Sequence, residues 1–354
     1  MTTDTVEVGY EELCGALAAK DLQPLWKINK ELMPYEPLPK TLPWLWKWTT
    51  LLPLAERCGE LVTIDRGGDR RVLALCNPGL NGLPYTSTTL WGAIQYLGAH
   101  ESAPAHRHSP AAVRFVMEGD GVWTTVDGDA CDMTPGDLIL TPNWCWHDHT
   151  NAGDKPMVWF DGLDLPLVGW MESVFFELYP DDLQPVRTRN GSERMYGRGV
   201  RASATTHDRP HSPLLRYPYS ETHVRLEEIL AETKSETATL SYVNPLNGRS
   251  ALPTLGLRMT RIRTGGATAV VRKTGASVIV VFKGTGHSVV DGQRFDWAEN
   301  DIFVTPSWSA VEHHADDQAD LFAVDDEPVL SALGLFREET LTERQEPVET
   351  FVPR

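Results

Sequence analysis

The chain has 354 residues, 41% of them hydrophobic, and its 32 Lys and Arg against 49 Asp and Glu give a formal net charge of −17. This composition can build a sizeable core and excludes wholesale disorder, and the length indicates about two domains. A chain this acidic is repelled by phosphate backbones and by anionic lipid. Nucleic acid and membrane surfaces are therefore not expected as partners.

The N-terminal segment and the cysteines predict a cytoplasmic protein. The first residues are acidic where a signal peptide is basic and then apolar, and no apolar run approaches the roughly 18 residues that a membrane helix needs. The five cysteines are odd in number, scattered and without a CxxC pair. Such thiols are typical of a reducing compartment, and they indicate neither a disulfide framework nor a structural zinc site.

Residues 10–33 predict a helix that is broken at Pro24. A proline-rich stretch follows and surrounds alternating tryptophans in residues 44–48, which predicts an extended segment. These tryptophans could line a ligand, but packing onto their own domain or onto a neighbouring subunit is the simpler interpretation. We expect residues 1–60 to form an N-terminal helical arm.

The rest of the chain carries an internal duplication. The sequence VDG…PGDLILTPNW of residues 126–144 returns as VDG…ENDIFVTPSW at residues 290–308, and NPGLNG at residues 77–82 is echoed at residues 244–248. Each copy holds short runs of β-branched and aromatic residues separated by Gly-rich turns, which is typical of a sandwich or a small barrel. The expected organisation is a first barrel at residues 61–180, a connector with a short helix at residues 181–234 and a second barrel at residues 235–354.

Histidines in the first copy predict a metal site. Alternate residues of a strand share one face, so His106 and His108 in the sequence His-Arg-His direct two imidazoles to one point. His147 follows on a later predicted strand, beyond a Pro-Gly-Asp turn, and can supply a third. Three ligands leave open positions on an octahedral ion, and open positions suit a substrate and O₂ better than a purely structural role.

The motifs HxH, PGD and HxxxN inside a β-rich repeat resemble the two metal-binding motifs of the cupin superfamily, although residues 109–113 lack the Glu ligand of the usual first motif. The order NPGL, APxHRH, RF, EGxG and TPxWxWH resembles the gentisate and salicylate 1,2-dioxygenases over nearly the whole chain. This resemblance implies an all-β bicupin fold, with two cupin (jelly-roll) β-barrels behind the N-terminal arm. It also implies one Fe(II) per chain in the N-terminal barrel, with His106, His108 and His147 as ligands and O₂ as co-substrate.

The resemblance implies a dioxygenase of aromatic degradation that inserts O₂ across the C1–C2 bond of a 2-hydroxybenzoate. Gentisate, salicylate and 5-substituted salicylates such as 5-nitrosalicylate are the candidate substrates. Three neutral imidazoles leave the ion its full double charge, which favours such an anionic, chelating acid. Trp91 and the run Gly121–Thr124 favour the salicylate branch, but the choice among these acids stays open. The resemblance further implies a homotetramer.

Further residues match the positions that the family uses around the substrate. The guanidinium fork of Arg suits a carboxylate and a phenolate, and a charge in the apolar strand around Arg114 would be costly if it had no partner. Arg70 is adjacent to Arg71, so the two could exchange places by register alone. Family matching gives Arg70, Arg114, His149 and Asp161 as catalytic candidates and Arg70, Trp91, Ala93, Gln95 and Arg114 as substrate-binding candidates.

The second copy is predicted to bind no metal and to serve as structure or as a subunit interface. At the offset of 164 residues between Thr141 and Thr305, none of the candidate ligands is retained: the counterparts are Val270 for His106, Arg272 for His108 and Val311 for His147. At the offset of 162 residues set by Leu165-Pro166 and Glu327-Pro328, Asp161 becomes Ala323. The remaining histidines outside the site, among them His211, His223, His313 and His314, are interpreted as surface residues.

Two other functions stay open at this stage. A set of three histidines also describes zinc sites that activate water, which would make the protein a hydrolase or an isomerase. A cupin that binds or stores a ligand without catalysis is the second alternative. Retention of the ligands in only one copy argues against storage, and O₂ uptake by the Fe²⁺-loaded protein would separate all three functions.

Overall fold

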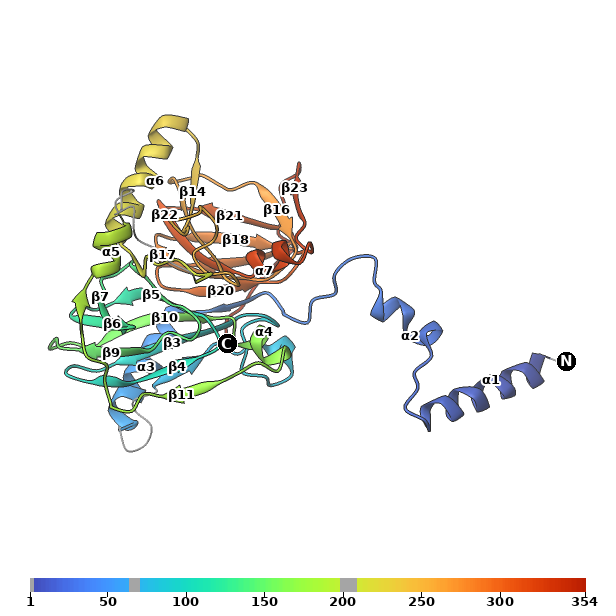
Figure 1. Cartoon of the computed structure of the whole chain (residues 1–354). Helices are drawn as coiled ribbons and strands as arrows, with labels where there is room; N and C mark the ends of the chain where they lie inside the picture. Colours follow the sequence, from blue (N-terminus) through green and yellow to red (C-terminus); the bar gives the residue numbers. More distant parts are fainter. Residues whose placement is uncertain (1–2, 64–70, 198–208) are drawn as a thin grey trace. The chain divides into compact units, whose positions relative to one another are not determined.

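The computed structural model describes residues 3–63, 71–197 and 209–354 (Figure 1). The chain divides into two compact units, Met1–Leu38 and Pro39–Arg354. The predicted arm of residues 1–60 therefore spans the first unit and the opening elements of the second. None of the described helices is long and apolar enough to cross a membrane.

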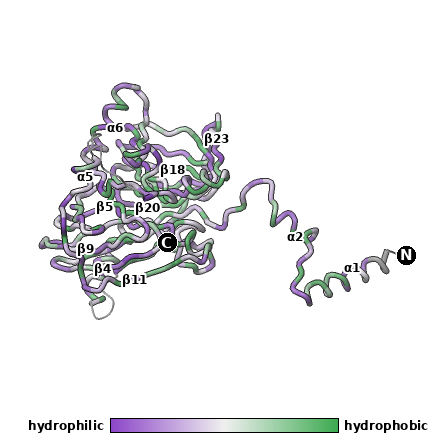
Figure 2. Tube along the Cα trace, viewed as in Figure 1, coloured by the Kyte–Doolittle hydropathy of each residue, from purple (hydrophilic) through white to green (hydrophobic). Residues whose placement is uncertain are grey.

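The first unit consists of two helices, α1 (Thr3–Ala18) and α2 (Leu25–Leu32). The predicted break at Pro24 is confirmed, because this residue is extended and immediately precedes α2. Trp26 donates its indole N–H to the Tyr10 hydroxyl at 3.1 Å, which ties α2 to α1. Hydrophobic and hydrophilic residues are interleaved along α2 (Figure 2), as expected for a helix with one apolar side.

The second unit is built from short strands, and each copy of the repeat supplies the same series. The strands of the first copy are β2 (Val72–Ala74), β3 (Trp91–Leu97), β4 (Ser102–His108), β5 (Ala112–Glu118), β6 (Val122–Val126), β7 (Asp129–Asp132), β8 (Leu138–Thr141), β9 (His147–Asn151), β10 (Met157–Leu163), β11 (Phe176–Leu178), β12 (Thr188–Arg189) and β13 (Arg216–Tyr217). Those of the second sheet pair are β1 (Trp44–Trp46), β14 (Thr237–Ser241), β15 (Gly256–Ile262), β16 (Val270–Lys273), β17 (Ser277–Lys283), β18 (Gly286–Val290), β19 (Gln293–Trp297), β20 (Ile302–Thr305), β21 (Val311–Ala315), β22 (Ala319–Asp325), β23 (Glu338–Leu341) and β24 (Glu349–Thr350).

These strands form four six-stranded sheets, two for each copy. The first copy has the orders β13-β8-β5-β10-β3-β2 and β11-β4-β9-β6-β7-β12, and the second has β1-β20-β17-β22-β15-β14 and β23-β16-β21-β18-β19-β24. The orders correspond strand for strand, so the duplication read from the sequence is confirmed as a duplication of architecture. The described helices of this unit are α3 (Trp48–Leu61), α4 (Leu165–Trp170), α5 (Gly191–Tyr196), α6 (Tyr219–Thr233) and α7 (Glu327–Ala332).

Two segments outside the repeat complete the edges of these sheets. β1 comes from the N-terminal side of the chain but pairs with β20 of the second copy, where Leu45 lies opposite Phe303. β13 in the connector pairs in the same way with β8 of the first copy. The packing interpretation of the tryptophans is confirmed, since Trp44 and Trp46 pack against the core and Trp48 lies within it.

Among the described residues, the larger of two hydrophobic clusters runs through both copies, and the smaller lies in the sheets of the second copy. Phe115 of β5 stacks on Phe322 of β22 at a centroid distance of 4.1 Å, and Phe282 of β17 meets Phe115 edge-on. The Pro-Gly-Asp turn also joins the copies. Gly136 has φ +87°, and a Cβ there would lie 2.6 Å from the Tyr219 ring, so only glycine fits this turn without displacing α6.

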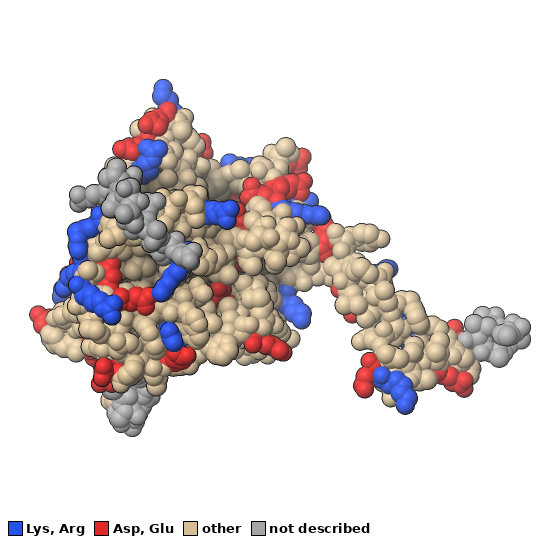
Figure 3. All heavy atoms as spheres, in the orientation of Figure 1, with Lys and Arg blue, Asp and Glu red and all other residues tan. Residues whose placement is uncertain are grey.

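On the face shown in Figure 3, Lys and Arg side chains lie among Asp and Glu side chains. They do not form a continuous basic surface on that face.

Candidate metal centre

The structure brings the three predicted histidine ligands together in the first barrel. β4 carries His106 and His108 on one face, and its antiparallel neighbour β9 places His147 opposite His106. One ring nitrogen from each histidine lies within 4.8 Å of the others. The His106 and His147 rings are 4.3 Å apart between centroids, and those of His108 and His147 are 4.8 Å apart. This spacing suits three ligands of a single ion.

Backbone carbonyls fix which nitrogen of each ring faces the centre. The Nδ1 atoms of His106, His108 and His147 lie 2.8, 2.7 and 3.0 Å from the carbonyl oxygens of Pro104, Pro110 and Cys145. A carbonyl oxygen only accepts, so each Nδ1 carries the proton and each Nε2 keeps its lone pair. In every case the carbonyl belongs to a residue two positions away in the sequence. Metal-ligating histidines are commonly oriented in this manner.

The donor set fits a metal ion. His147 Nε2 is buried and has no hydrogen-bond partner among the described residues, and a buried nitrogen of this kind requires a ligand. Burial, and then the neighbouring His106 and His108, hold the pKa of His147 well below its usual value. The ring is therefore neutral, as a ligand must be. Among the described residues, no carboxylate joins the three imidazoles in this group.

A cavity of about 220 Å³ is lined by two of the three histidines, His106 and His108. Its walls come mainly from β3, β4, β5 and β10, so residues far apart in sequence share one site. The described lining residues are Val72, Trp91, Gln95, Ala103, His106, His108, Pro110, Ala112, Arg114, His149, Asp161, Leu163, Leu165, Val174, Phe175 and Phe176.

Arg114 is the cationic group of this cavity. It is 4% exposed, and its guanidinium donates to the Thr141 hydroxyl at 2.6 Å. Asp161 lies 3.5 Å from Arg114 Nε, yet Nε itself has no hydrogen-bond partner among the described residues. Burial lowers the pKa of Arg114, although Asp161 opposes this effect. A buried guanidinium with a spare donor at the cavity wall is suited to an anionic ligand.

Asp161 lies beside Arg114, because β10 and β5 pair these two residues in register, and both line the cavity. Burial raises the pKa of Asp161 to about 6, while Arg114 and a hydrogen bond from the Trp159 indole at 3.1 Å lower it. The carboxylate therefore orients the guanidinium at neutral pH and gains a proton in mildly acidic conditions.

His149 is 1% exposed and lines the cavity, so it is not a solvent-exposed turn residue. The Thr124 hydroxyl lies 2.8 Å from its Nδ1. The Trp159 ring is 5.2 Å away between centroids and fixes the other side of the imidazole. The ring of the ligand His147 is 6.3 Å away. The side chain thus borders the metal centre without belonging to the ligand group.

Of the three predicted pocket residues on β3, two line the cavity and one does not. Trp91 and Gln95 line the cavity, as their shared strand face indicated. Ala93 lies between them, fully buried and opposite Asp161 in the ladder, and is not among the described lining residues. Arg70 lies outside the described residues. Its neighbour Arg71 is ion-paired with Glu101, so it has a structural role.

Sequence reasoning missed the wall formed by residues 174–176. Phe176 of β11 lies opposite His108 in the ladder with β4, and its ring stacks on His106 at 5.2 Å. It also missed Val72 and Leu163. Leu163 shares the strand face of Asp161 two positions away, so strand alternation could have found it. The segment 174–176 carries no such signal, because it lies outside the repeated pattern.

The second copy retains none of these ligands, but two of the sequence-derived counterparts are wrong by one position. Trp144 N–H donates to His108 O at 2.9 Å, and Trp308 N–H donates to Lys273 O at 2.7 Å. Lys273 therefore corresponds to His108, and by the same register Val271 corresponds to His106. Arg272 and Val270 are therefore not the counterparts of these two histidines.

Two histidines that were interpreted as surface residues are not on the surface. His211 is 4% exposed, and His313 lines a cavity.

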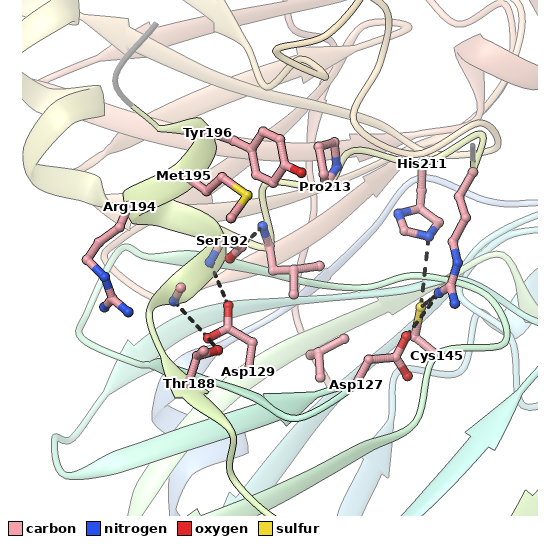
Figure 4. Close-up of a pocket in the computed structure, with 14 residues that line it drawn as sticks. Asp127, Asp129, Cys145, Thr188, Ser192, Arg194, Met195, Tyr196, His211 and Pro213 are labelled. Carbon is pink, nitrogen blue, oxygen red and sulfur yellow. Dashed lines mark hydrogen bonds and ion pairs between the residues drawn. The ribbon is translucent and has the colours of Figure 1, made fainter. Parts of the chain in front are cut away.

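A larger cavity, about 700 Å³, lies between the β6–β7 turn and the connector (Figure 4). Arg209 donates to Asp127 at 2.9 Å and to the Cys145 sulfur at 3.0 Å, and His211 Nε2 lies 3.9 Å from that sulfur. Burial raises the pKa of Cys145 to about 12, so the thiol stays protonated and unreactive. These contacts hold the connector to the first barrel, and none of the three histidine ligands lines this cavity.

Comparison with known proteins agrees with this geometry. A family model for a cupin domain matches residues 93–163. The chain is 46% identical over 351 residues to a gentisate 1,2-dioxygenase of a Streptomyces species, covering 95% of this chain and 98% of the relative. It is 36% identical over 343 residues to a 5-aminosalicylate 1,2-dioxygenase of a Comamonas species, covering 95% and 91%. A salicylate 1,2-dioxygenase of Pseudoaminobacter salicylatoxidans, solved as adducts with gentisate, superposes with a TM-score of 0.91 at 40% identity, covering 97% and 96%.

Proposed function

The chain belongs to the gentisate 1,2-dioxygenase family of cupin proteins, and we propose that it cleaves the ring of a 2-hydroxybenzoate between C1 and C2 with O₂. The observation that carries the proposal is a group of three converging imidazoles, two of which line one cavity together with the buried guanidinium of Arg114. A site of this kind offers a metal to chelating oxygens and a cation to a carboxylate.

Fe(II) is the proposed metal, one ion per chain, held by the Nε2 atoms of His106, His108 and His147. When bound, a ferrous ion supplies open coordination positions and the electron density that O₂ activation requires. The three neutral ligands do not reduce its double charge. An anionic acid that binds through two oxygens therefore compensates the charge better than a neutral substrate.

Arg114 is assigned to the substrate carboxylate. Its Nε and the remaining N–H groups at the cavity wall can form charge-assisted hydrogen bonds, while Thr141 and Asp161 hold the guanidinium in place. Asp161 is in this account a positioning residue for Arg114. Arg70 is assigned to the same substrate by family resemblance.

The aromatic ring is assigned to the space between Trp91 and Gln95 on one side and Phe176 on the other. Ala93 lies between these two residues on β3, so the size of its side chain should influence which ring substituents fit. A cavity of about 220 Å³ fits one substituted ring. His149 is assigned to the phenol proton, which must leave the hydroxyl before that oxygen can chelate a metal.

The candidate substrates are gentisate, salicylate and 5-substituted salicylates such as 5-aminosalicylate and 5-nitrosalicylate. The relatives named for gentisate and for 5-aminosalicylate, together with Trp91, support this range. We also propose, from the family resemblance, a cytoplasmic enzyme that assembles as a homotetramer.

An oxygen electrode and product mass spectrometry test the proposal. The Fe²⁺-loaded chain should consume O₂ with at least one acid of this panel and release a product heavier than the substrate by two oxygen atoms. Activity that persists without O₂ after Zn²⁺ replaces Fe²⁺ would favour a hydrolase or isomerase instead. A chain that binds these acids but neither consumes O₂ nor changes them would be a binding protein.

A further inference from the structure

The second barrel contains a cavity of about 340 Å³, larger than the cavity beside the metal centre. It is built from the equivalent strands, chiefly β14, β15, β16, β17 and β21. The described lining residues are Thr237, Thr239, Arg258, Thr260, Thr268, Ala269, Val271, Lys273, Gly275, Ser277, Ile279, Thr305, Pro306, Ser309, Val311, His313, Ala323 and Glu338. A volume of this size lies at the lower end of the range for small-molecule sites.

The residues that replace the metal ligands leave this space open and give it a distinct chemistry. Val271 and Val311 stand where the first barrel has His106 and His147, and they make one wall apolar. Lys273 stands in the place of His108. Where the first barrel has three imidazoles, the second barrel therefore has an apolar wall and an ammonium group.

Two cations at this cavity share one buried carboxylate, and Arg258 also pairs with Glu327. Lys273 Nζ lies 2.9 Å from Asp325 Oδ2, and Arg258 lies 2.5 Å from the same oxygen. The Lys273 and Arg258 side chains are 23% and 24% exposed, whereas Asp325 is 1% exposed and does not line the cavity. The carboxylate thus orients both cations from behind and leaves part of each facing the cavity.

The first barrel also pairs a buried carboxylate with a cation at its own cavity. There Asp161 on β10 pairs with Arg114 on β5, and both line the cavity. In the second barrel Ala323 takes the place of Asp161 and Ile279 that of Arg114. Lys273 and Arg258 with Asp325 are therefore a different set of charges, placed on other positions of the same fold.

His313 has an equivalent beside the first cavity, His149. Ser288 Oγ lies 2.7 Å from His313 Nδ1, as the Thr124 hydroxyl lies 2.8 Å from His149 Nδ1 in the first barrel. Burial lowers the pKa of His313 to about 4, so at neutral pH the ring is an uncharged hydrogen-bonding group in the cavity wall. Such a polar group, once inside a cavity, is suited to hold a ligand without adding charge.

We propose that this cavity is a second binding site, independent of metal, for a small monocarboxylic acid with an apolar body. The carboxylate is held by Lys273 and Arg258, and the apolar body packs against Val271, Ile279 and Val311. Asp325 and Glu327 already balance the charge of these two cations, and Glu338 lines the cavity. A monocarboxylate therefore fits better than a phosphate, which would bring a second negative charge. The inference does not depend on the dioxygenase assignment.

Calorimetric titration of the full-length, iron-loaded Arg114→Met chain with benzoate tests the proposal. Benzoate has no 2-hydroxyl group to chelate a metal, and the substitution removes the cation of the first cavity. We expect saturable binding with one site per chain. Lys273→Met should weaken this binding at least about tenfold, the scale of one charge-assisted hydrogen bond. Hexanoate, titrated in parallel, shows whether the apolar body must be aromatic.

Ala323→Phe is the second variant, because it fills the cavity and keeps all charges. It should abolish binding, and it decides the question if Lys273→Met does not fold. Lys155→Met, at an exposed lysine outside both cavities, is the matched control and should bind as the parent does. Absence of saturable binding of both acids, or binding that survives in Lys273→Met and Ala323→Phe, would overturn the proposal.

Discussion

Replacement of Arg114 by methionine isolates the contribution of its guanidinium to substrate binding. The two side chains have similar length, so the change removes the charge and donors while largely preserving the apolar stem. Hydrogen bonds to a charged group contribute about 1.5 to 3 kcal/mol. Because Arg114 is 4% exposed, solvent does not screen this interaction. The expected loss of substrate affinity is therefore roughly 10- to 150-fold.

Metal binding should survive this substitution, because Arg114 is not among the three ligands. The assay is a steady-state measurement of KM and kcat for O₂ uptake, with iron content determined on the same samples. KM should rise and the iron content should stay that of the parent. The removal of the positive charge should also raise the pKa of Asp161 further, because the cation that lowers it is gone.

Arg107→Met is the matched control. Arg107 lies between two ligands in sequence, but its guanidinium faces away from the site, over the Trp146 ring at 4.4 Å and against Glu177. Its loss should leave KM within about twofold, since it removes no group that lines the cavity. An Arg114→Met chain with normal iron content and an unchanged KM would refute the assignment of the carboxylate to this residue.

Four further substitutions test separate parts of the reasoning. His106→Ala should lose metal and activity together, whereas a lone Val311→His should alter neither, as measured by metal analysis and O₂ uptake. Asp164→Asn should stabilise the chain at pH 7 by about 3 kcal/mol at most, because burial raises the pKa of this carboxyl from 3.8 to about 6. The gain in stability should disappear below about pH 4, because the ionised carboxyl destabilises the folded state only as the pH rises from about 4 towards 6. Equal shifts of the melting temperature at pH 7 and below pH 4 would contradict this reasoning. Phe176→Ala should raise KM with little change in iron content, because the ring lines the cavity and stacks on a ligand without binding metal.

The convergence of the three histidines was predictable from sequence, in part from strand geometry and in part from the cupin motifs. Alternation places His106 and His108 on one face, and the antiparallel ladder of β4 and β9 brings His147 opposite. The tautomers were not predictable. They depend on where the carbonyls of Pro104 and Pro110 point, and this is set by the backbone path at each end of the motif.

The second-copy counterparts predicted for His106 and His108 were wrong by one position because of a difference in loop length. The repeat offset was taken from Thr141 and applied to strands that precede the β5–β6 turn. That turn has three residues, 119–121, and its equivalent between β17 and β18 has two, 284–285. Strands before the turn are therefore displaced by one position more than those after it. A constant offset cannot follow a change in loop length, whereas hydrogen-bond register can.

The corrected register can be tested by introducing a second metal centre into the second barrel. A chain with Val271→His, Lys273→His and Val311→His places imidazoles at the structural positions of the first triad. The carbonyls that would orient them belong to Ala269, Gly275 and Ser309, which are two residues away as in the first barrel. The variant should bind two metal ions per chain, measured by metal analysis after gel filtration, because alternate residues of β16 then face β21 correctly.

The matched control carries Val270→His, Arg272→His and Val311→His. Arg272 stacks over the Trp308 ring at 4.8 Å and pairs with Glu339, as Arg107 does with Trp146 and Glu177 in the first barrel, so its side chain faces away from the cavity. A histidine in its place would point outward, and this chain should bind a single ion. One ion per chain in the first variant, or two in the control, would refute the register on which both the corrected counterparts and the second cavity depend.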